Sequence, residues 1–369
     1  MTDRDLKIPF YLKAIFFFIG IIALVAILYL AQGIIVPLIF AIILSILLHP
    51  VVNFFTRIGI NRVVAIVITL FLTVLVIAAF GFLLFSQASR FSESWPVLVD
   101  KFSALLNQTI NWVSGYLDIN PQKIEVWLTK TKSELINTSS AAIGQTLVTV
   151  GGGVIILFLI PVYIFLILFY HPLLLDFIHK VFATSNQGQV SMIVNKIKTV
   201  VQRYLVGLLI EAVMVAVLNI TALLILGIEY AILLGIIGAL LNVIPYVGGL
   251  VAVALPMMIA LVTKSTPWYA LYVLAAYYCI QLFDNHFIVI KIVASKVRIN
   301  ALFAIIVVLA GNALWGIPGM FLSLPLLAII KVIFDHIEPL KPWGYLLGDT
   351  MPSILKIKLT LKKLKNKTS

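Results

Sequence analysis

Two carboxylic acids lie inside stretches of sequence that are otherwise apolar. Glu211 stands about two helical turns into one such stretch, and Asp284 lies near the end of another. If these stretches cross a membrane, each charge costs several kcal/mol, so such residues tend to be paired or functional. We predict that both acids carry a proton or a cation. Interfacial carboxylates, or structural pairs with Arg203 or Lys291, are the alternative that the sequence leaves open.

Amide side chains accompany both acids. Asn219 follows Glu211 by two turns, which places it on a similar face of a helix. Gln281 and Asn285 stand on either side of Asp284 in the sequence. These five residues are our candidates for a polar relay inside the apolar segments.

Two apolar runs longer than thirty residues, 230–262 and 300–334, are each interrupted near the centre by polar and helix-breaking residues. Such a break frees backbone N–H and C=O groups that hydrocarbon cannot satisfy, so it must lie in protein or line a wet cavity. We predict that the two breaks meet near the bilayer centre and share the cavity of a substrate pathway. The residues concerned are Asn242, Pro245, Tyr246, Gly248 and Gly249 in the first run, and Gly311, Asn312, Gly316, Pro318 and Gly319 in the second.

Composition indicates a membrane protein. Of the 369 residues, 62% are hydrophobic and 11% are charged, and the mean hydropathy is +1.15. A soluble domain has a much lower apolar fraction. Several runs exceed the roughly 20 residues that a helix needs to cross the hydrocarbon core. We therefore predict an all-α, polytopic membrane protein with about six to eight membrane segments.

The chain divides into four parts by composition. We expect an N-terminal block of three spans at 1–88 (about 14–31, 33–50 and 63–88) and a C-terminal membrane core at 144–340 with further spans at about 144–170, 205–226 and 267–290. Between them, 89–143 is polar with apolar residues at helical spacing, which predicts a pair of amphipathic helices outside the bilayer. Residues 341–369 form a basic tail that suits an anionic lipid surface or stays disordered.

The distribution of Lys and Arg favours reentrant hairpins over two long kinked helices at the broken runs. With the N-terminus in the cytoplasm, Arg57, Arg62 and the basic segment 171–203 all fall on the cytoplasmic side. Treating each broken run as a hairpin also keeps three later basic residues there (Lys291, Lys296 and Arg298), together with the C-terminal tail. Lys264 is the exception, because this topology leaves it outside.

The two broken runs also carry a resemblance to a known family. LLNVIPYVGGLVAVALPMMIAL and GNALWGIPGMFLSLPLLAIIKVIFD are similar to the paired motifs of the autoinducer-2 exporter (AI-2E) family of permeases, which includes PerM-like transporters. The likeness covers nearly the whole chain, including the Leu48-His-Pro-Val51 stretch and the polar insertion. It implies an inner-membrane transporter without an ATPase domain, in a family linked to export of a small furanone signal or to sodium/proton exchange.

The chain departs from this family pattern before the second broken run. Asp284 stands where family members usually have Glu, so the charge is kept. Ile290, Asn300 and Ala301 stand where the family has a proline and then a His-Pro pair. These departures put the geometry at the start of the second run in doubt.

The sequence lacks the motifs of zinc proteases, serine hydrolases and Walker-type ATPases. We therefore predict no enzymatic activity, no cofactor and no metal site; the cluster Asp335, His336 and Glu338 points its neighbours in different directions on a helix. The net charge of +12 lies at helix ends and in the tail, which argues for lipid rather than nucleic acid as its partner.

Three functions follow as hypotheses. The first is secondary export or permeation of small polar molecules across the inner membrane, with both termini cytoplasmic and a homo-oligomeric assembly. The second is a sodium/proton-type antiporter or an ion-conducting pore, which would make Glu211 and Asp284 indispensable. The third is a non-transporting membrane scaffold that uses 89–143 to bind a partner.

Overall fold

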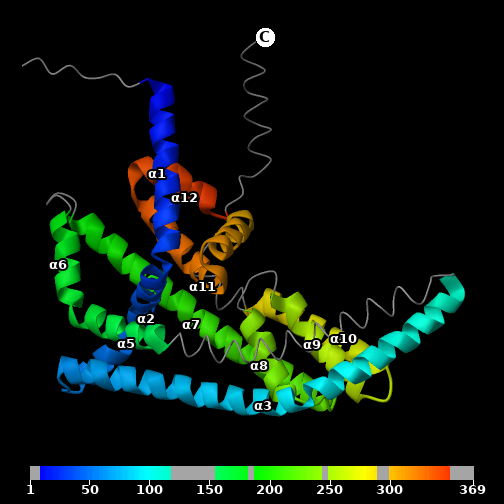
Figure 1. Cartoon of the computed structure of the whole chain (residues 1–369). Coiled ribbons are helices and arrows are strands. Elements are labelled where there is room, and N and C mark those ends of the chain that lie inside the picture. Colours follow the sequence, from blue (N-terminus) through cyan, green and yellow to red (C-terminus); the bar gives the residue numbers. More distant parts are fainter. Residues whose placement is uncertain (1–8, 118–153, 182–186, 243–247, 289–298, 350–369) are drawn as a thin grey trace, which may run out of the picture.

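The computed structural model describes residues 9–117, 154–181, 187–242, 248–288 and 299–349. Helices dominate this part of the chain, and it contains no strand. Figure 1 shows α1 projecting from the remaining helices. The helices are α1 (Phe10–Leu30), α2 (Gln32–Arg57), α3 (Arg62–Leu117), α5 (Val154–Phe169), α6 (His171–Val181), α7 (Gln187–Ile225), α8 (Ala231–Asn242), α9 (Gly248–Thr263), α10 (Trp268–Phe283), α11 (Ala301–His336) and α12 (Lys341–Leu347), with a 3-10 turn at Glu338–Leu340.

The helices have the length and surface of a polytopic membrane protein, as the composition predicts. Five of them (α1, α2, α3, α7 and α11) contain apolar stretches long enough to span a bilayer, and α5 and α6 form a further pair bent by 65°. The most apolar stretch of α1 is 0% buried. Large side chains such as Phe16 and Ile22 therefore stand exposed, which suits contact with lipid.

One helix of 56 residues, α3, runs through the predicted boundary at residue 88. Part of its second half also packs on the membrane core. Leu98 is buried in a cluster with residues of α8, α9 and α10, and Phe91 and Phe102 pack against the same cluster. The polar composition of this segment did not indicate the apolar face that packs α3 against the membrane core. Residues 118–153 lie outside the described part.

The helix that contains the fifth predicted span also begins earlier than that span. We predicted a polar segment up to residue 203 and a span at 205–226, but α7 begins at Gln187 and continues to Ile225. Its first half keeps an apolar face that includes Val190 and Val201, both buried. Basic residues such as Lys196 occupy the exposed faces. From Gln187 on, the basic segment is therefore part of a helix and not a loop.

The first broken run folds as a helical hairpin. Helices α8 and α9 pack against each other on either side of 243–247, which lies outside the described residues. The outer ends of the hairpin meet: a side chain at Gly227 would touch the Lys264 ammonium, and Ile228 shares a buried cluster with Val262. This contact excludes the alternative of one long kinked helix for residues 230–262.

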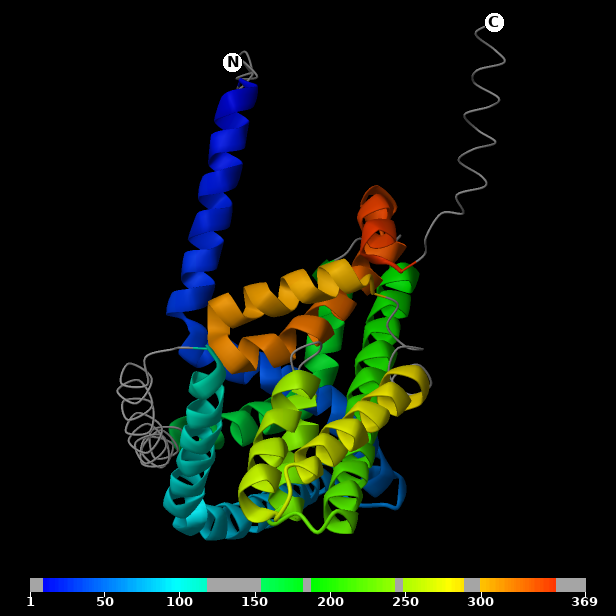
Figure 2. The same ribbon diagram turned by 90° about the vertical axis from the view of Figure 1, so that its right-hand side faces the viewer.

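The second broken run is also a hairpin, folded within α11. Gly316 has φ 63° and ψ −144°, a backbone conformation that reverses the chain and that suits glycine. Beyond the turn the two arms are in contact: the Ser323 hydroxyl of one arm donates to the Val307 carbonyl of the other at 2.8 Å. Figure 2 shows the arms running back alongside each other. Sequence length and breaks thus predicted both hairpins correctly.

Two further contacts fix this second hairpin in place. At its start, the Asn300 side chain accepts a hydrogen bond from the Leu302 N–H at 2.9 Å and caps α11. At its end, α12 packs on α11, and the Leu347 carbonyl accepts from the Asn300 N–H at 2.8 Å. The predicted tail therefore begins later than residue 341; residues 350–369 lie outside the described part.

We expect both ends of the α8–α9 hairpin to face the same side of the membrane. In a chain whose Cys279 is replaced by serine, Glu229→Cys and Lys264→Cys should react with an impermeant maleimide from one side. Asn61→Cys, in the turn between α2 and α3, is the control and should react from the opposite side. Labelling of Glu229→Cys and Lys264→Cys from opposite sides would contradict a reentrant hairpin.

Candidate transport site

One face of α7 carries both of its predicted polar residues into the interior. Tyr204, Glu211, Val215 and Asn219 recur at helical spacing along this face and are all buried. Glu211 is 7% exposed and Asn219 is 2% exposed. The sequence prediction that these two residues share a face is therefore confirmed. Arg203 is exposed and does not share it.

Asp284 is buried where α10 ends. The chain continues from α10 through a π-helical turn at 284–288, a rare geometry that often occurs at functional sites. Asp284 is 1% exposed. Its Oδ2 accepts a hydrogen bond of 2.8 Å from Nδ2 of Asn242, the last residue of α8. The broken end of the first hairpin is thus tied directly to the buried acid.

A small polar cavity surrounds this hydrogen bond, between α7, α8, α9 and α10. Its volume is about 10 Å³, which is at the limit for one water molecule. The site is therefore closed in this conformation. Among the described residues the wall combines polar and small side chains without a Lys or Arg: Val215, Asn219, Gly238, Asn242, Gly249, Ala252, Tyr277, Ile280, Gln281 and Asp284. Lys291, the alternative partner for the acid, lies outside the described residues.

Glycines let the helices approach closely around this cavity. A side chain at Gly249 would collide with Oε1 of Gln281, and one at Gly238 would come within 3.0 Å of Nδ2 of Asn219. Gly238 also faces the Tyr277 hydroxyl. Close approach of this kind is common where helices pack in membranes. The glycines therefore hold the polar groups in contact and leave no space for a substituent.

Three buried polar atoms in the cavity wall have no hydrogen-bond partner among the described residues. They are Oδ1 of Asp284, Oδ1 of Asn219 and the Tyr277 hydroxyl. An unsatisfied buried polar group costs about 1–3 kcal/mol, so three in one place indicate a site for a polar ligand. Two of these atoms are acceptors and the hydroxyl can donate or accept, which suits a proton, a cation or the hydroxyl of a solute.

The two carboxyl groups also influence each other, because Glu211 lies within electrostatic range of Asp284. Glu211 occupies a middle position on α7. Residues 201–208 before it pack in a cluster with Leu322 of α11, and Val215 after it packs with Ala239 of α8. Glu211 therefore stands between the parts of α7 that support the two hairpins.

The other predicted residues are distributed between the two hairpins. Gln281 lies in the cavity wall, while Asn285 is exposed and accepts a long hydrogen bond of 3.4 Å from Gln281. Gly248 begins α9. Pro245 and Tyr246 lie outside the described residues.

The second set of predicted residues lies within α11. Gly311 and Gly319 face each other across the hairpin, and Gly316 makes its turn, next to the exposed Asn312 and Pro318.

The shared cavity that we expected between the two breaks stays a prediction, because the first break, 243–247, lies outside the described residues. Within the described residues, α11 packs mainly against α7, α12, α2 and α1, and it has no extensive interface with α8 or α9. The reason is that α7 offers a separate surface to each hairpin. At the tip of the α11 hairpin, Trp315 Nε1 instead donates to the Leu28 carbonyl of α1 at 3.0 Å.

Sequence reasoning missed five residues of the cavity wall: the apolar Val215, Ala252 and Ile280, and also Tyr277, which brings a hydroxyl, and Gly238, which allows a close helix contact there. Tyr277 stands in an apolar run rich in tyrosine, so its hydroxyl gave no distinct signal. Gly235 and Gly238 form a small-residue spacing in α8 that could have predicted close helix contact. The structure shows that contact, since a side chain at Gly235 would collide with the backbone of Ile220 on α7.

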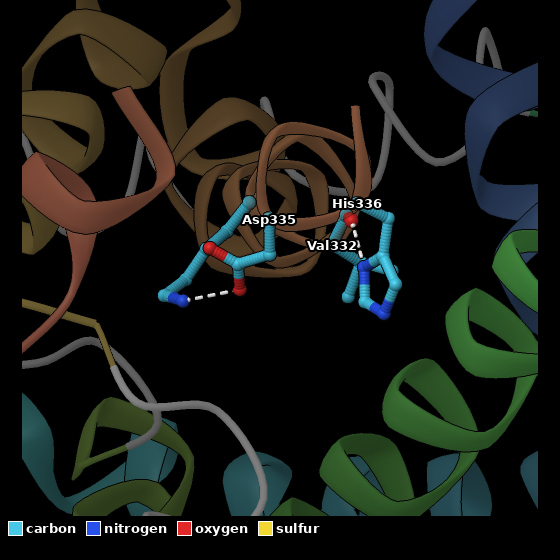
Figure 3. A network of polar contacts seen from close by, with 4 residues as sticks. Val332, Asp335 and His336 are labelled. Carbon is cyan, nitrogen blue, oxygen red and sulfur yellow. Dashed lines mark hydrogen bonds and ion pairs between the residues drawn. The ribbon is translucent and has the colours of Figure 1, made fainter. Parts of the chain in front are cut away.

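The acidic and histidine residues at the end of α11 point in different directions. Figure 3 shows Asp335 and His336 on opposite sides of the helix. Asp335 pairs with Lys331 at 2.6 Å, and His336 Nδ1 donates to the Val332 carbonyl at 2.7 Å. Glu338 pairs with Lys341. Each group thus has a partner of its own, and within the described residues no group of three His, Cys, Asp or Glu could hold a metal ion.

Long apolar helices, two hairpins and a buried polar cavity together define a membrane protein of the permease type. The chain belongs to the AI-2E transporter family, whose profile matches residues 16–338. That family consists of permease-type transporters, which are not enzymes.

Similar proteins come from distant bacteria and match over most of their length. The chain is 25% identical to YrrI of Bacillus subtilis, described provisionally as a transport protein, over 83% of this chain and 87% of YrrI. It is 23% identical to the AI-2 transport protein TqsA of Escherichia coli, over 86% of this chain and 90% of TqsA. It is also 23% identical to PerM of Escherichia coli, described provisionally as a permease, over 87% and 92% of the two chains.

Proposed function

We propose that the protein is a secondary transporter that exports small polar molecules across the inner membrane. The observation that carries this proposal is the buried hydrogen bond between Asn242 and Asp284 at the broken end of a helical hairpin. Discontinuous helices with polar groups at membrane depth form the substrate and ion sites of many secondary transporters. The relative TqsA, named for AI-2 transport, makes AI-2 the first substrate to test.

In this proposal a proton or cation binds at Asp284 and is relayed by Glu211. Asp284 offers a free oxygen next to the unpartnered atoms of Asn219 and Tyr277. Among the described residues, the cavity wall holds no basic residue that would neutralise the acid permanently. Because the cavity has room for about one water molecule, movement of the α8–α9 hairpin is required to admit a solute.

A sodium/proton antiporter or an ion pore is the second candidate, and a specific observation favours it. Two buried acids lie within electrostatic range of each other, and two carboxyl groups in this relation suit exchange of protons for another cation. A scaffold without transport activity would have no use for the unpartnered groups. We further propose that both termini are cytoplasmic and that the protein forms a homo-oligomer through its exposed apolar helices.

Flux measurements in proteoliposomes test these alternatives. We expect wild-type protein to move AI-2 or another small polar solute faster than protein-free vesicles do, and a pH or sodium gradient to increase this flux. Sodium/proton exchange without movement of any solute would identify the antiporter instead. Absence of flux for every solute and ion, with monodisperse protein in the vesicles, would contradict both transport proposals.

A further inference from the structure

A second cavity, distinct from the transport site, lies where α2, α3, α5, α6 and α7 meet. It has a volume of about 360 Å³, which on the order of ten water molecules would fill. Its described wall includes no carboxylate and consists of His49, Val52, Asn53, Thr56, Ile60, Arg62, Leu168 and His171. Lys198 of α7 stands directly behind this wall, with its Nζ 3.2 Å from Nδ1 of His49.

Two cations, Lys198 and Arg62, lie close together here without a carboxylate partner among the described residues. Lys198 and Arg62 both act electrostatically on the imidazole of His171. The rings of His49 and His171 lie 4.8 Å apart between centroids. Within the part of the chain that the structure describes, neither cation forms a salt bridge with a carboxylate. Lys198 is partly buried, whereas Arg62 is exposed. A partly buried cation normally has such a partner, so Lys198 in particular lacks an anion among the described residues.

The hydrogen bonds inside the cluster leave several donors available. His49 Nδ1 lies within hydrogen-bond distance of both Lys198 and Asn53 Nδ2, so it accepts and the ring's proton is on Nε2. Arg62 uses one N–H on the Leu168 carbonyl, at 2.7 Å. Its other N–H groups, the remaining hydrogens of Lys198 and the second amide hydrogen of Asn53 are left for a ligand.

We propose that this cavity binds a phosphate group. A guanidinium, an ammonium, an imidazole and an amide around one space suit the several oxygens of a tetrahedral anion better than they suit a single-atom ion such as chloride. The phosphate belongs either to the headgroup of an anionic lipid or to a free, water-soluble anion. The end of α2 and the start of α3 face the cytoplasm in the topology above, where both sources are present.

The first test uses the full-length protein in dodecyl maltoside, which contains no phosphate. We expect inorganic phosphate to bind saturably by calorimetry if the site takes a free anion. After reconstitution into phosphatidylglycerol mixed with a neutral glycolipid and extraction back into detergent, mass spectrometry should find retained phosphatidylglycerol if the site takes a headgroup. Wild-type protein that neither binds phosphate nor retains phosphatidylglycerol overturns the proposal.

Variants test whether phosphate binds in this cavity or through general positive charge on the surface. Lys198→Gln should weaken whichever binding is found about tenfold, and Lys198→Arg should restore it. Asn53→Asp keeps the side-chain size but puts a negative charge into the cavity, so it should abolish binding. The matched control is Lys180→Gln, since Lys180 is exposed and paired with Asp176 on α6. If Lys180→Gln weakens binding as much as Lys198→Gln, or if Asn53→Asp leaves binding intact, the cavity is not the site.

Discussion

Replacing Asp284 by asparagine is expected to abolish gradient-driven transport and to leave the fold intact. The substitution keeps the shape of the side chain, and its oxygen can still accept the Asn242 hydrogen bond. It removes the one charge among the described residues that line the transport cavity. A hydrogen bond to a charged group contributes about 1.5–3 kcal/mol, so affinity for a bound cation should fall roughly ten- to a hundredfold from one such contact alone.

The measurement is flux into proteoliposomes under a pH or sodium gradient, with thermal unfolding of the same preparation. Asp176→Asn is the matched control, because Asp176 is an exposed acid in a surface ion pair with Lys180. We expect the control to transport like the wild type. Undiminished flux through Asp284→Asn would show that the cavity charge is not used.

The second large effect concerns the α11 hairpin. Gly319→Val should prevent the protein from folding stably, because the added side chain would collide with the backbone carbonyl of Gly311 on the facing arm. A collision with backbone is harder to relieve than one with a side chain, and overpacking costs 1–3 kcal/mol or more. We expect a destabilisation of about 3 kcal/mol or greater, seen as loss of monodisperse protein or a strongly lowered unfolding temperature.

Gly81→Val is the control for this prediction. Gly81 lies in α3, and a side chain there would meet nothing within 4 Å in the described structure. Its effect should be confined to a small change in helix propensity. Equal unfolding temperatures for Gly319→Val and Gly81→Val would mean that the two arms of the hairpin are not packed as described.

Sequence patterns predicted the hairpins because chain reversal has local causes. Gly316 is a residue that tolerates a positive φ, and an apolar run of more than thirty residues is too long for one span. Glu211 and Asp284 were predicted as candidate residues for a similar reason, since a carboxylate in an apolar run is easily recognised in the sequence. Glu211, Asn219 and Asp284 all proved to be buried, as expected of residues with a role inside the membrane core.

Long-range packing was not predictable in the same way. Nothing local in α3 marks Phe91 and Leu98 as partners of α8 and α9, because their spacing fits any amphipathic helix. The pairing of Asn242 with Asp284 likewise depends on how α8 and α10 come together. The position of α7, which gives the described part of each hairpin a packing surface of its own, was likewise not marked in the sequence.

The length of α3 gives it a mechanical property. Arg62 at its start lines the proposed phosphate cavity, and Phe91 farther along stacks edge-on against Tyr230 at the base of the α8–α9 hairpin, with ring centroids 5.3 Å apart. The stretch between them is about 44 Å long at 1.5 Å per residue. Its only internal proline, Pro96, lies beyond Phe91. A tilt of about 5° around Arg62 would therefore displace Phe91 by about 4 Å, so the helix acts as a lever arm that turns a small rotation at one end into a large translation of the hairpin's anchor at the other.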